Sequence, residues 1–295
     1  MKIIMIGHGM VGHKFIESVL EHVGDDVEIT ILAEEPRLAY DRVHLTEYFS
    51  GKSAKDLTLC RADFADAYGI DLRLNTKAVA IDQSHKTVTT NHGDVLSFDK
   101  LILATGSYAF VPPISGNDRE NCFVYRTIED LDAIRAASLN AKSGVVIGGG
   151  LLGLEAAKAL RDLNLETHVV EFAPRLMAVQ IDDLGGKVLR AKIENLGVKV
   201  HTQKATSSIE EGATTKHVMK FGDGSELETD IILFSAGIRP RDELARQSGL
   251  ALGERGGIMI NDYCQTSNPD IYAIGECALW QNKIYGLVAP GYDID

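Results

Sequence analysis

The chain has 295 residues, of which 45% are hydrophobic and 24% are charged, and its formal net charge at pH 7 is −12. This length allows two domains, and the apolar content is sufficient for packed cores, which excludes an intrinsically disordered chain. The acidic balance argues against a nucleic-acid partner and against an anionic membrane surface. No apolar run reaches transmembrane length, and the amino terminus does not resemble a signal peptide, so we expect a cytoplasmic protein.

A dinucleotide-binding fingerprint begins at the amino terminus. The short apolar run 2–6 predicts a buried parallel strand, and Gly7, Gly9 and Gly12 follow it in the spacing G-x-G-x-x-G. The first glycine permits a sharp turn, the second lets a pyrophosphate approach the backbone, and the third lets the helix pack closely on the strand. The helix predicted over 11–22 would direct its unpaired N–H groups at the phosphates.

The next strand and an acidic residue complete this first site. A strand is predicted over 27–32, and Glu34 lies 22 residues after Gly12. At this distance an acid accepts hydrogen bonds from the hydroxyl groups of the adenosine ribose. A glycine-rich turn in an ordinary α/β protein is the alternative, but it would not explain the strand, the helix and the acid together. The predicted contacts of this first dinucleotide also include Met10, Val11 and Glu35.

The same pattern recurs in the second half of the chain. Gly148, Gly150 and Gly153 follow an apolar strand, and Glu171 ends the next strand 18 residues after Gly153. A carboxylate at this position accepts from ribose hydroxyls and repels a 2′-phosphate, so NADH is favoured over NADPH. Arg175 lies close enough in the sequence to leave NADPH possible. The predicted contacts of this second dinucleotide also include Leu151, Leu152, Glu155 and Phe172.

Each half then continues into a meander and another buried strand. Alternating apolar and polar residues over 72–101 predict a β-meander, and a matching pattern surrounds 218–227. The buried strands that follow end in Ala104-Thr105-Gly106 and Ser235-Ala236-Gly237. A strand at 270–276 has no fingerprint of its own, so we expect it to return to the first domain.

The four cysteines are scattered along the chain. Cys60, Cys122, Cys264 and Cys277 include no C-x-x-C or other close pair. Neither a disulfide framework nor a zinc site is therefore predicted, and no pair of them is typical of a redox disulfide. We predict no metal site in this chain.

These motifs, in this order, resemble the flavoprotein reductases of the pyridine nucleotide–disulfide oxidoreductase superfamily. The resemblance covers essentially the whole chain and implies an α/β fold like that of glutathione reductase, with two Rossmann-like domains and three-stranded meanders. It implies that the first fingerprint holds FAD and the second holds NADH. It also implies FAD contacts at Arg42, whose loop approaches the pyrophosphate, and at Ala78, Gly275 and Glu276. The two turns that match the family imply further contacts, with FAD at Ala104, Thr105 and Gly106 and with NADH at Ala236 and Gly237. Glu276 takes the place of the family's usual aspartate, which binds the ribityl chain.

The resemblance also implies a discontinuous arrangement of domains. Residues 1–112 and 242–295 would form the FAD-binding domain, and residues 113–241 would form an NAD(P)H-binding domain inserted in it. The pair Pro112-Pro113 would mark the crossover. The flavin carries the hydride chemistry at N5, so we predict no obligatory catalytic side chain. Glu155 is expected near the nicotinamide and the flavin.

Longer strings of sequence narrow the resemblance. They are similar to the large subunits of NAD(P)H-dependent nitrite reductase and lie at 10–17, 34–45, 149–157, 171–177 and 286–292. That family implies an electron-input module in which hydride passes from NADH to FAD and electrons continue to iron–sulfur and sirohaem modules. It also implies a small subunit as a partner. The cysteine ligands of those modules are not among the 295 residues, so we interpret the chain as a fragment.

Two other functions remain open at this point. The chain could be a stand-alone NADH-dependent reductase of rubredoxin or ferredoxin. Such reductases often carry a lysine after Leu-Ser in the first loop, where Leu45-Thr46 is followed here by Glu47. The chain could instead be a non-catalytic NAD sensor or scaffold. A cysteine peroxidase of the same superfamily is disfavoured, because Val43 stands where those enzymes carry their redox cysteine.

Overall fold

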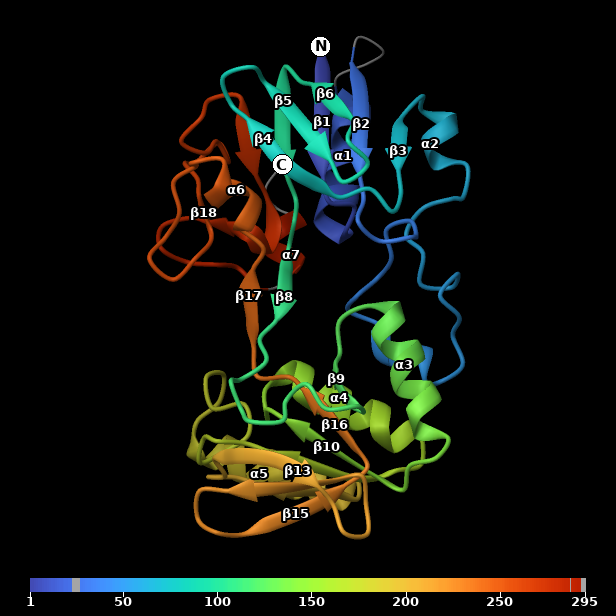
Figure 1. Ribbon diagram of the computed structural model, residues 1–295, viewed down its shortest axis with the longest axis vertical. Coiled ribbons are helices and arrows are strands. Elements are labelled where there is room, and N and C mark those ends of the chain that lie inside the picture. The colour runs from blue at the N-terminus through green and yellow to red at the C-terminus, as the bar shows by residue number, and fades with distance from the viewer. Residues whose placement is uncertain (23–26, 287, 293–295) are drawn as a thin grey trace. The chain divides into compact units, whose positions relative to one another are not determined.

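A computed structural model describes residues 1–22, 27–286 and 288–292. The chain forms two compact units (Figure 1). The first unit comprises Met1–Asp41, Leu57–Tyr108 and Arg239–Asp295, and the second comprises Arg42–Asp56 and Ala109–Ile238. Each unit contains a five-stranded parallel sheet and a three-stranded antiparallel sheet, which confirms the predicted α/β class. Within the described ranges, no helix is long and apolar enough to span a bilayer.

The parallel sheet of the first unit has the strand order β19-β7-β1-β2-β3. Its strands are β19 (Ile271–Ala273), β7 (Lys100–Leu103), β1 (Lys2–Ile6), β2 (Glu28–Leu32) and β3 (Asp71–Arg73). Both faces of β1 are covered: Met5 packs with Ile16 of helix α1 (Met10–His22), and Ile4 packs with Val88 of the antiparallel sheet. Burial on both faces explains why this strand reads as a continuous apolar run.

The antiparallel sheet of the first unit is the predicted meander. It joins β4 (Ala78–Asp82), β5 (Thr87–Thr90) and β6 (Val95–Ser97) in sequence order. The strand expected near 270–276 is confirmed as β19, which pairs in parallel with β7 and is followed by the 3-10 turn η3. The described part of this unit also contains α2 (Phe64–Ala67), α6 (Glu243–Gln247), β18 (Ile258–Met259), η3 (Gly275–Cys277), β20 (Ala278–Leu279) and α7 (Val288–Tyr292).

The second unit repeats this plan. Its parallel sheet joins, in spatial order, β12 (Val198–His201), β11 (Glu166–Val170), β10 (Ser143–Ile147), β16 (Ile231–Phe234) and β9 (Cys122–Val124). Its meander joins β13 (Thr206–Glu211), β14 (His217–Phe221) and β15 (Glu226–Thr229). Met219 and Phe221 of the meander pack on Val145 and Phe234 of the parallel sheet. The helices are α3 (Ile128–Ser138), α4 (Leu151–Asp162) and α5 (Asp183–Asn195).

Residues 42–56 group with the second unit, whereas the sequence assigned them to the first domain. This segment contains the 3-10 helix η2 (Leu45–Tyr48). Arg135 of α3 donates from Nη2 to the carbonyl oxygen of Tyr48 at 2.6 Å, and its guanidinium lies 4.2 Å from the centroid of the Tyr48 ring. Tyr125 donates to the Thr46 hydroxyl at 3.2 Å. The chain passes between the units at the paired strands β8 (Ser107–Ala109) and β17 (Ile238–Pro240).

Candidate functional site

The glycine loop of the first unit connects β1 to α1. Gly7 has a φ of +104°, and a Cβ there would lie 2.2 Å from the carbonyl oxygen of Ala104, so only glycine fits this turn. A Cβ at Gly12 would lie 2.8 Å from the carbonyl oxygen of Gly7, which shows that the helix packs directly on the turn. A Cβ at Gly9 would meet no atom within 4 Å. The second glycine therefore faces open space, where a phosphate could approach the backbone.

The loop of the second unit has the same geometry. Gly148 has a φ of +121°, and a Cβ there would lie 2.2 Å from the carbonyl oxygen of Ser235. A Cβ at Gly153 would lie 2.0 Å from the carbonyl oxygen of Gly148, while a Cβ at Gly150 would meet nothing within 4 Å. Two loops separated by more than a hundred residues thus provide the same turn, the same packing contact and the same open position.

Both loops lie at the carboxyl edge of a parallel sheet. In each unit the loop is flanked by the turn that follows the neighbouring strand, because β1 pairs with β7 and β10 pairs with β16. Thr105 donates from its hydroxyl to the carbonyl oxygen of Arg241 at 2.6 Å, and Gly237 accepts from the N–H of Phe110 at 2.8 Å. Ligands of open α/β sheets bind at this edge.

The two helix amino termini fit the phosphates of a dinucleotide. α1 has 13 residues and α4 has 12 residues, so both are long enough to have developed end dipoles. The N-cap of α4 is Gly150, which offers no side-chain acceptor to the first N–H groups of the helix. Those N–H groups need an acceptor from outside the helix. A diphosphate beside Gly9 or Gly150 would supply it.

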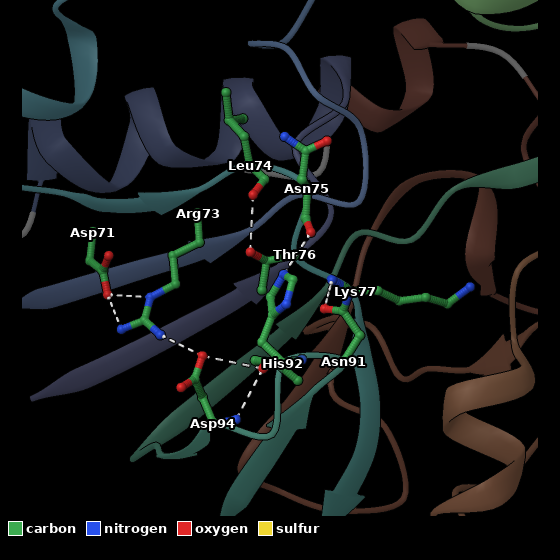
Figure 2. A network of polar contacts seen from close by, with 10 residues as sticks. Asp71, Arg73, Leu74, Asn75, Thr76, Lys77, Asn91, His92 and Asp94 are labelled. Carbon is green, nitrogen blue, oxygen red and sulfur yellow. Dashed lines mark hydrogen bonds and ion pairs between the residues drawn. The ribbon is translucent and has the colours of Figure 1, made fainter.

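The acid at the end of the second strand is neutralised by two cations in the first unit. Lys77 Nζ lies 3.0 Å from Glu34 Oε1, and Arg241 Nη1 lies 3.0 Å from Glu34 Oε2. The main chain of Lys77 is held in turn by Asn91, which accepts from its N–H at 2.9 Å and donates to its carbonyl oxygen at 2.8 Å. Figure 2 shows this contact within a wider network that fixes the start of β4. The sequence motif gave no sign of either cation.

The corresponding acid in the second unit is held by backbone amides. Glu171 accepts from the N–H of Gly149 at 2.5 Å and from the N–H of Ala173 at 2.7 Å. Phe172, which follows the acid, is 77% exposed. Arg175 donates from Nη1 to Asp183 at 2.7 Å and from Nε to a carbonyl oxygen of its own loop at 3.1 Å. Arg175, the arginine that left NADPH possible, thus already binds acceptors of its own unit and not a 2′-phosphate. This arrangement favours NADH.

The late acid, Glu276, follows a glycine that lies against the first turn of α1. It belongs to η3, where Gly275 has a φ of +73° and where a Cβ would touch Val11 at 3.4 Å. Ser107 donates from its hydroxyl to Glu276 Oε2 at 2.7 Å, and Ser107 is only 5% exposed. The structure therefore brings Val11, Gly275 and Glu276 together and adds Ser107, a residue that the sequence did not single out.

Three other residues predicted to contact FAD each have different neighbours in the structure. Ala78 is buried at the start of β4. Glu35 accepts from the hydroxyl of Tyr40 at 2.8 Å. Arg42 groups with the second unit and donates from Nη1 to the carbonyl oxygen of Arg126 at 3.1 Å. A pyrophosphate contact of Arg42 stays a prediction.

The remaining predicted contacts lie in the first turns of α1 and α4. Met10 begins α1, and Leu151 and Leu152 begin α4 with 48% and 41% of their surface exposed. Glu155 lies one turn further along α4, where burial raises the pKa of its carboxyl group and the nearby His44 lowers it. The expected place of Glu155 near the nicotinamide and the flavin stays a prediction.

One residue of the first loop is a buried histidine. His8 is 9% exposed, and neither of its ring nitrogens has a hydrogen-bond partner in the described part of the chain. Its ring lies 5.5 Å from the ring of His13 and 6.5 Å from that of Phe64. Burial, followed by the neighbouring His13, lowers the pKa of His8 to about 4. Gly149 takes the corresponding position in the second loop, so this feature distinguishes the two sites.

All four cysteines are free thiols in the described chain. Burial raises the pKa of Cys60, Cys264 and Cys277, and it raises the pKa of Cys122 to about 11. A thiol reacts as its thiolate, so raised pKa values make these groups poor nucleophiles at neutral pH. The sequence interpretation, which assigned no redox cysteine pair, agrees with this chemistry.

Two Rossmann-like units, each with a glycine loop and a strand-end acid at the carboxyl edge of its sheet, define a two-dinucleotide oxidoreductase. The chain belongs to the pyridine nucleotide-disulphide oxidoreductase family, whose family model matches residues 1–290. The predicted superfamily and the predicted oxidoreductase class are thereby confirmed.

Comparison with individual proteins narrows the relationship. The chain is 56% identical over 293 residues to the nitrite reductase (NADH) large subunit of Escherichia coli (strain K12), a match that covers 99% of this chain and 35% of that protein. The predicted similarity to nitrite reductase large subunits is thus confirmed. The chain spans about a third of the length of the nitrite reductases that it matches. It is also 29% identical to the rubredoxin-NAD(+) reductase of Alcanivorax borkumensis, with 98% of this chain and 75% of that protein covered.

The solved structure of an NAD-dependent persulfide reductase from A. fulgidus has the same fold. It matches with a TM-score of 0.92 and 29% sequence identity, and the match covers 100% of this chain and 57% of that chain. The predicted fold, with two Rossmann-like domains, is confirmed by this match and by the sheet topology.

Proposed function

We propose that this chain is the FAD-containing, NADH-oxidising electron-input module of a nitrite reductase large subunit. The duplicated site is the observation that carries the proposal. In each unit an open glycine, a helix amino terminus and a strand-end acid lie at one edge of a parallel sheet, the combination that binds the diphosphate and ribose of a dinucleotide. Similarity over 99% of the chain to nitrite reductase large subunits supports the particular reductase.

The first unit would hold FAD. Gly9 and the amino terminus of α1 would bind the diphosphate, Glu34 would accept from the adenosine ribose, and Glu276 would accept from the ribityl chain. The second unit would hold NADH through Gly150, α4 and Glu171. These assignments follow the predicted domains, 1–112 and 242–295 for FAD and 113–241 for NADH, except that residues 42–56 and 109–112 belong to the second unit and residues 239–241 to the first.

Bound flavin supplies a hydride acceptor, and the chain's own residues bind and orient the two dinucleotides. Hydride transfer from NADH requires no side-chain base, so no residue has to hold a proton at the reacting atoms. Glu155, in the first turns of α4, would lie on the nicotinamide side of its unit. The four cysteines are separate free thiols and do not offer a disulfide as the next electron carrier, so we propose one-electron transfer to a partner centre.

The partners would be the iron–sulfur and sirohaem modules of the full subunit, together with a small subunit. One relative that is 39% identical over 99% of this chain is named as the electron transfer subunit of an assimilatory nitrate reductase, which supports an electron-transfer role. We propose that the assembly works in the cytoplasm, as the composition of the chain led us to expect.

The test uses the 295-residue protein after incubation with FAD. We expect it to retain FAD, to oxidise NADH with ferricyanide as acceptor, and to use NADPH more slowly. We expect no reduction of nitrite by the same preparation. Failure to bind FAD, or a bound flavin that NADH does not bleach, would contradict the proposal and favour an NAD sensor or scaffold. Nitrite reduction by these residues alone would contradict the role of an input module.

A stand-alone NADH-dependent reductase of rubredoxin or ferredoxin is the second candidate. It is supported by the similarity of 98% of this chain to a rubredoxin reductase at 29% identity. Purified rubredoxin and ferredoxin should be compared as acceptors in the same NADH assay. Saturable reduction of either protein at micromolar concentration would favour this alternative.

A further inference from the structure

Arg241 is anchored beside one strand of the first unit, and its side chain reaches another. Its N–H donates to the carbonyl oxygen of Gly106 at 2.9 Å, and its carbonyl oxygen accepts from the Thr105 hydroxyl at 2.6 Å. Its main chain is therefore held at the turn that follows β7. Its guanidinium group donates from Nη1 to Glu34 at 3.0 Å, and Glu34 lies just after β2.

The sheet order shows what lies between these two anchors. β1 pairs with β7 on one side and with β2 on the other. Adjacent strands are about 4.8 Å apart, so β7 and β2 are separated by about 10 Å. The side chain of Arg241 therefore spans from the turn after β7 to the residue Glu34 after β2, and the strand between these two, β1, leads into the loop from Gly7 to Gly9 at the carboxyl edge of the sheet. This is the edge at which Gly9 faces open space.

The charges at this edge favour an anionic ligand. Glu34 has two cationic partners, Lys77 and Arg241, so the three side chains together carry one net positive charge. Asn91 holds the main chain of Lys77 on both sides (Figure 2), which fixes the point from which the Lys77 side chain reaches Glu34. The amino terminus of α1 adds positive potential to the same edge. One of the two cations is therefore not needed to balance the Glu34 carboxylate and is available to bind phosphate.

We propose that Arg241 is a dinucleotide-binding residue of the first unit that binds the diphosphate. When the ligand binds, its guanidinium exchanges Glu34 for phosphate oxygens, and Glu34 becomes available to the ribose hydroxyl groups while Lys77 remains as its counter-ion. A guanidinium group suits this role because its planar fork binds phosphate with two hydrogen bonds. The inference rests on the proposed binding of FAD to this unit.

The first test measures the dissociation constant of FAD by quenching of flavin fluorescence on apoprotein. Arg241→Met should raise the dissociation constant about tenfold or more, as expected for the loss of charge-assisted hydrogen bonds to phosphate. Arg241→Lys should lie between this variant and the wild type. Arg255→Met is the matched control, since Arg255 is an exposed arginine of the same unit, and it should change the constant less than twofold.

A second test separates phosphate binding from a structural role. ADP contains a diphosphate and adenosine does not, so Arg241→Met should weaken ADP binding and leave adenosine binding unchanged. The affinity for FAD should also depend less steeply on salt in this variant, because one screened charge contact is lost. The melting temperature of the apoprotein should change little, since a half-exposed ion pair contributes little to stability.

The outcomes distinguish this inference from the proposed function. If the wild-type apoprotein does not bind FAD, the proposed function is wrong and the assignment of Arg241 falls with it. If the wild type binds FAD and Arg241→Met binds it within twofold, only the assignment of Arg241 is overturned. Equal losses of ADP and adenosine affinity would also overturn it, because they would indicate a general disturbance of the site.

Discussion

The two units place an acid at the same strand end but satisfy its charge in different ways. Glu34 is paired with the side chains of two cations, Lys77 and Arg241. Glu171 is held by the backbone N–H groups of Gly149 and Ala173. Side chains can leave a carboxylate when a ligand arrives, whereas backbone amides of a packed loop cannot. The first site can therefore exchange partners on binding, and the second presents a fixed negative charge.

The two glycine loops, in contrast to the two acids, share the same backbone geometry. Their backbone turns are alike, because in both units the first glycine has a positive φ and lies against a carbonyl group that leaves no room for a Cβ. Their side chains differ between the first two glycines, where His8 is buried in the first loop and Gly149 takes its position in the second. The comparison teaches that backbone geometry is common to both sites, while selectivity and response to pH depend on the few side chains around it.

Replacing the first glycine of either loop should have the largest effect. Gly7→Ala combines a strained φ with a Cβ only 2.2 Å from a carbonyl oxygen, so we expect the free energy of unfolding to fall by about 3 kcal/mol or more. Gly148→Ala meets the same distance and should cost a similar amount. Urea denaturation followed by circular dichroism measures both.

The second glycines are the matched controls for that prediction. Gly9→Ala and Gly150→Ala place a methyl group in open space, so each should change stability by less than about 1 kcal/mol. Each should nevertheless weaken the binding of its dinucleotide, because the methyl group occupies the path of the phosphate. If Gly9→Ala destabilised the protein as much as Gly7→Ala, the open position assigned to the second glycine would be wrong.

After the glycine substitutions, the next largest effect is expected for coenzyme selectivity when Glu171 and Phe172 are replaced. In the double variant Glu171→Ser and Phe172→Arg, the fixed negative charge is lost and a cation is added at an exposed position. We expect the ratio of kcat/KM for NADPH to that for NADH to rise by at least about tenfold. Phe172→Ala serves as the control and should leave the ratio within about threefold. A double variant with the wild-type ratio would contradict the role of Glu171.

Sequence alone could predict those parts of the sites that contiguous residues determine. Strand, turn and helix follow from apolar runs and glycine spacing, and the acids follow from their distance to the loops. The partners of Glu34 could not be predicted, because Lys77 and Arg241 lie 43 and 207 residues away and carry no local pattern. The same holds for residues 42–56, whose place in the second unit depends on contacts such as that between Arg135 and Tyr48, 87 residues apart.

The buried histidine should make the stability of the first loop depend on pH. An unfolded imidazole takes up a proton below about pH 6.5, whereas burial delays protonation of His8 until about pH 4. Between these values the unfolded state binds more protons, so stability falls as pH falls, by up to about 1.4 kcal/mol per pH unit. His8→Leu should therefore lose less stability than the wild type between pH 7 and pH 5.

Urea denaturation at the two pH values measures this difference. His22→Gln is the control, because His22 is exposed at the end of α1 and its loss should leave the pH dependence unchanged. A His8→Leu variant that loses as much stability as the wild type on acidification would show that other groups, such as His13, account for the effect. The second loop, with Gly149 at this position, has no corresponding imidazole.

The smallest predicted effect concerns the carboxylate expected to bind the ribityl chain. Ser107→Ala removes the hydroxyl that donates to Glu276 at 2.7 Å, so Glu276 would be less firmly oriented. Loss of one such bond costs about 1 kcal/mol, which corresponds to a roughly fivefold higher dissociation constant for FAD. Ser107→Thr retains the hydroxyl and should restore most of the affinity.

Ser248→Ala is the control for that measurement. It also removes a hydroxyl from the first unit, one that donates to the carbonyl oxygen of Ala245 at 2.9 Å, and it should leave FAD affinity unchanged. Equal effects of the two variants would mean that Ser107 acts only on stability. The second unit has Ile238 where the first has Ser107, directly after the corresponding turn, and so lacks this hydroxyl. A selective effect of Ser107→Ala on FAD would therefore mark a further side-chain difference between two sites that share one backbone plan.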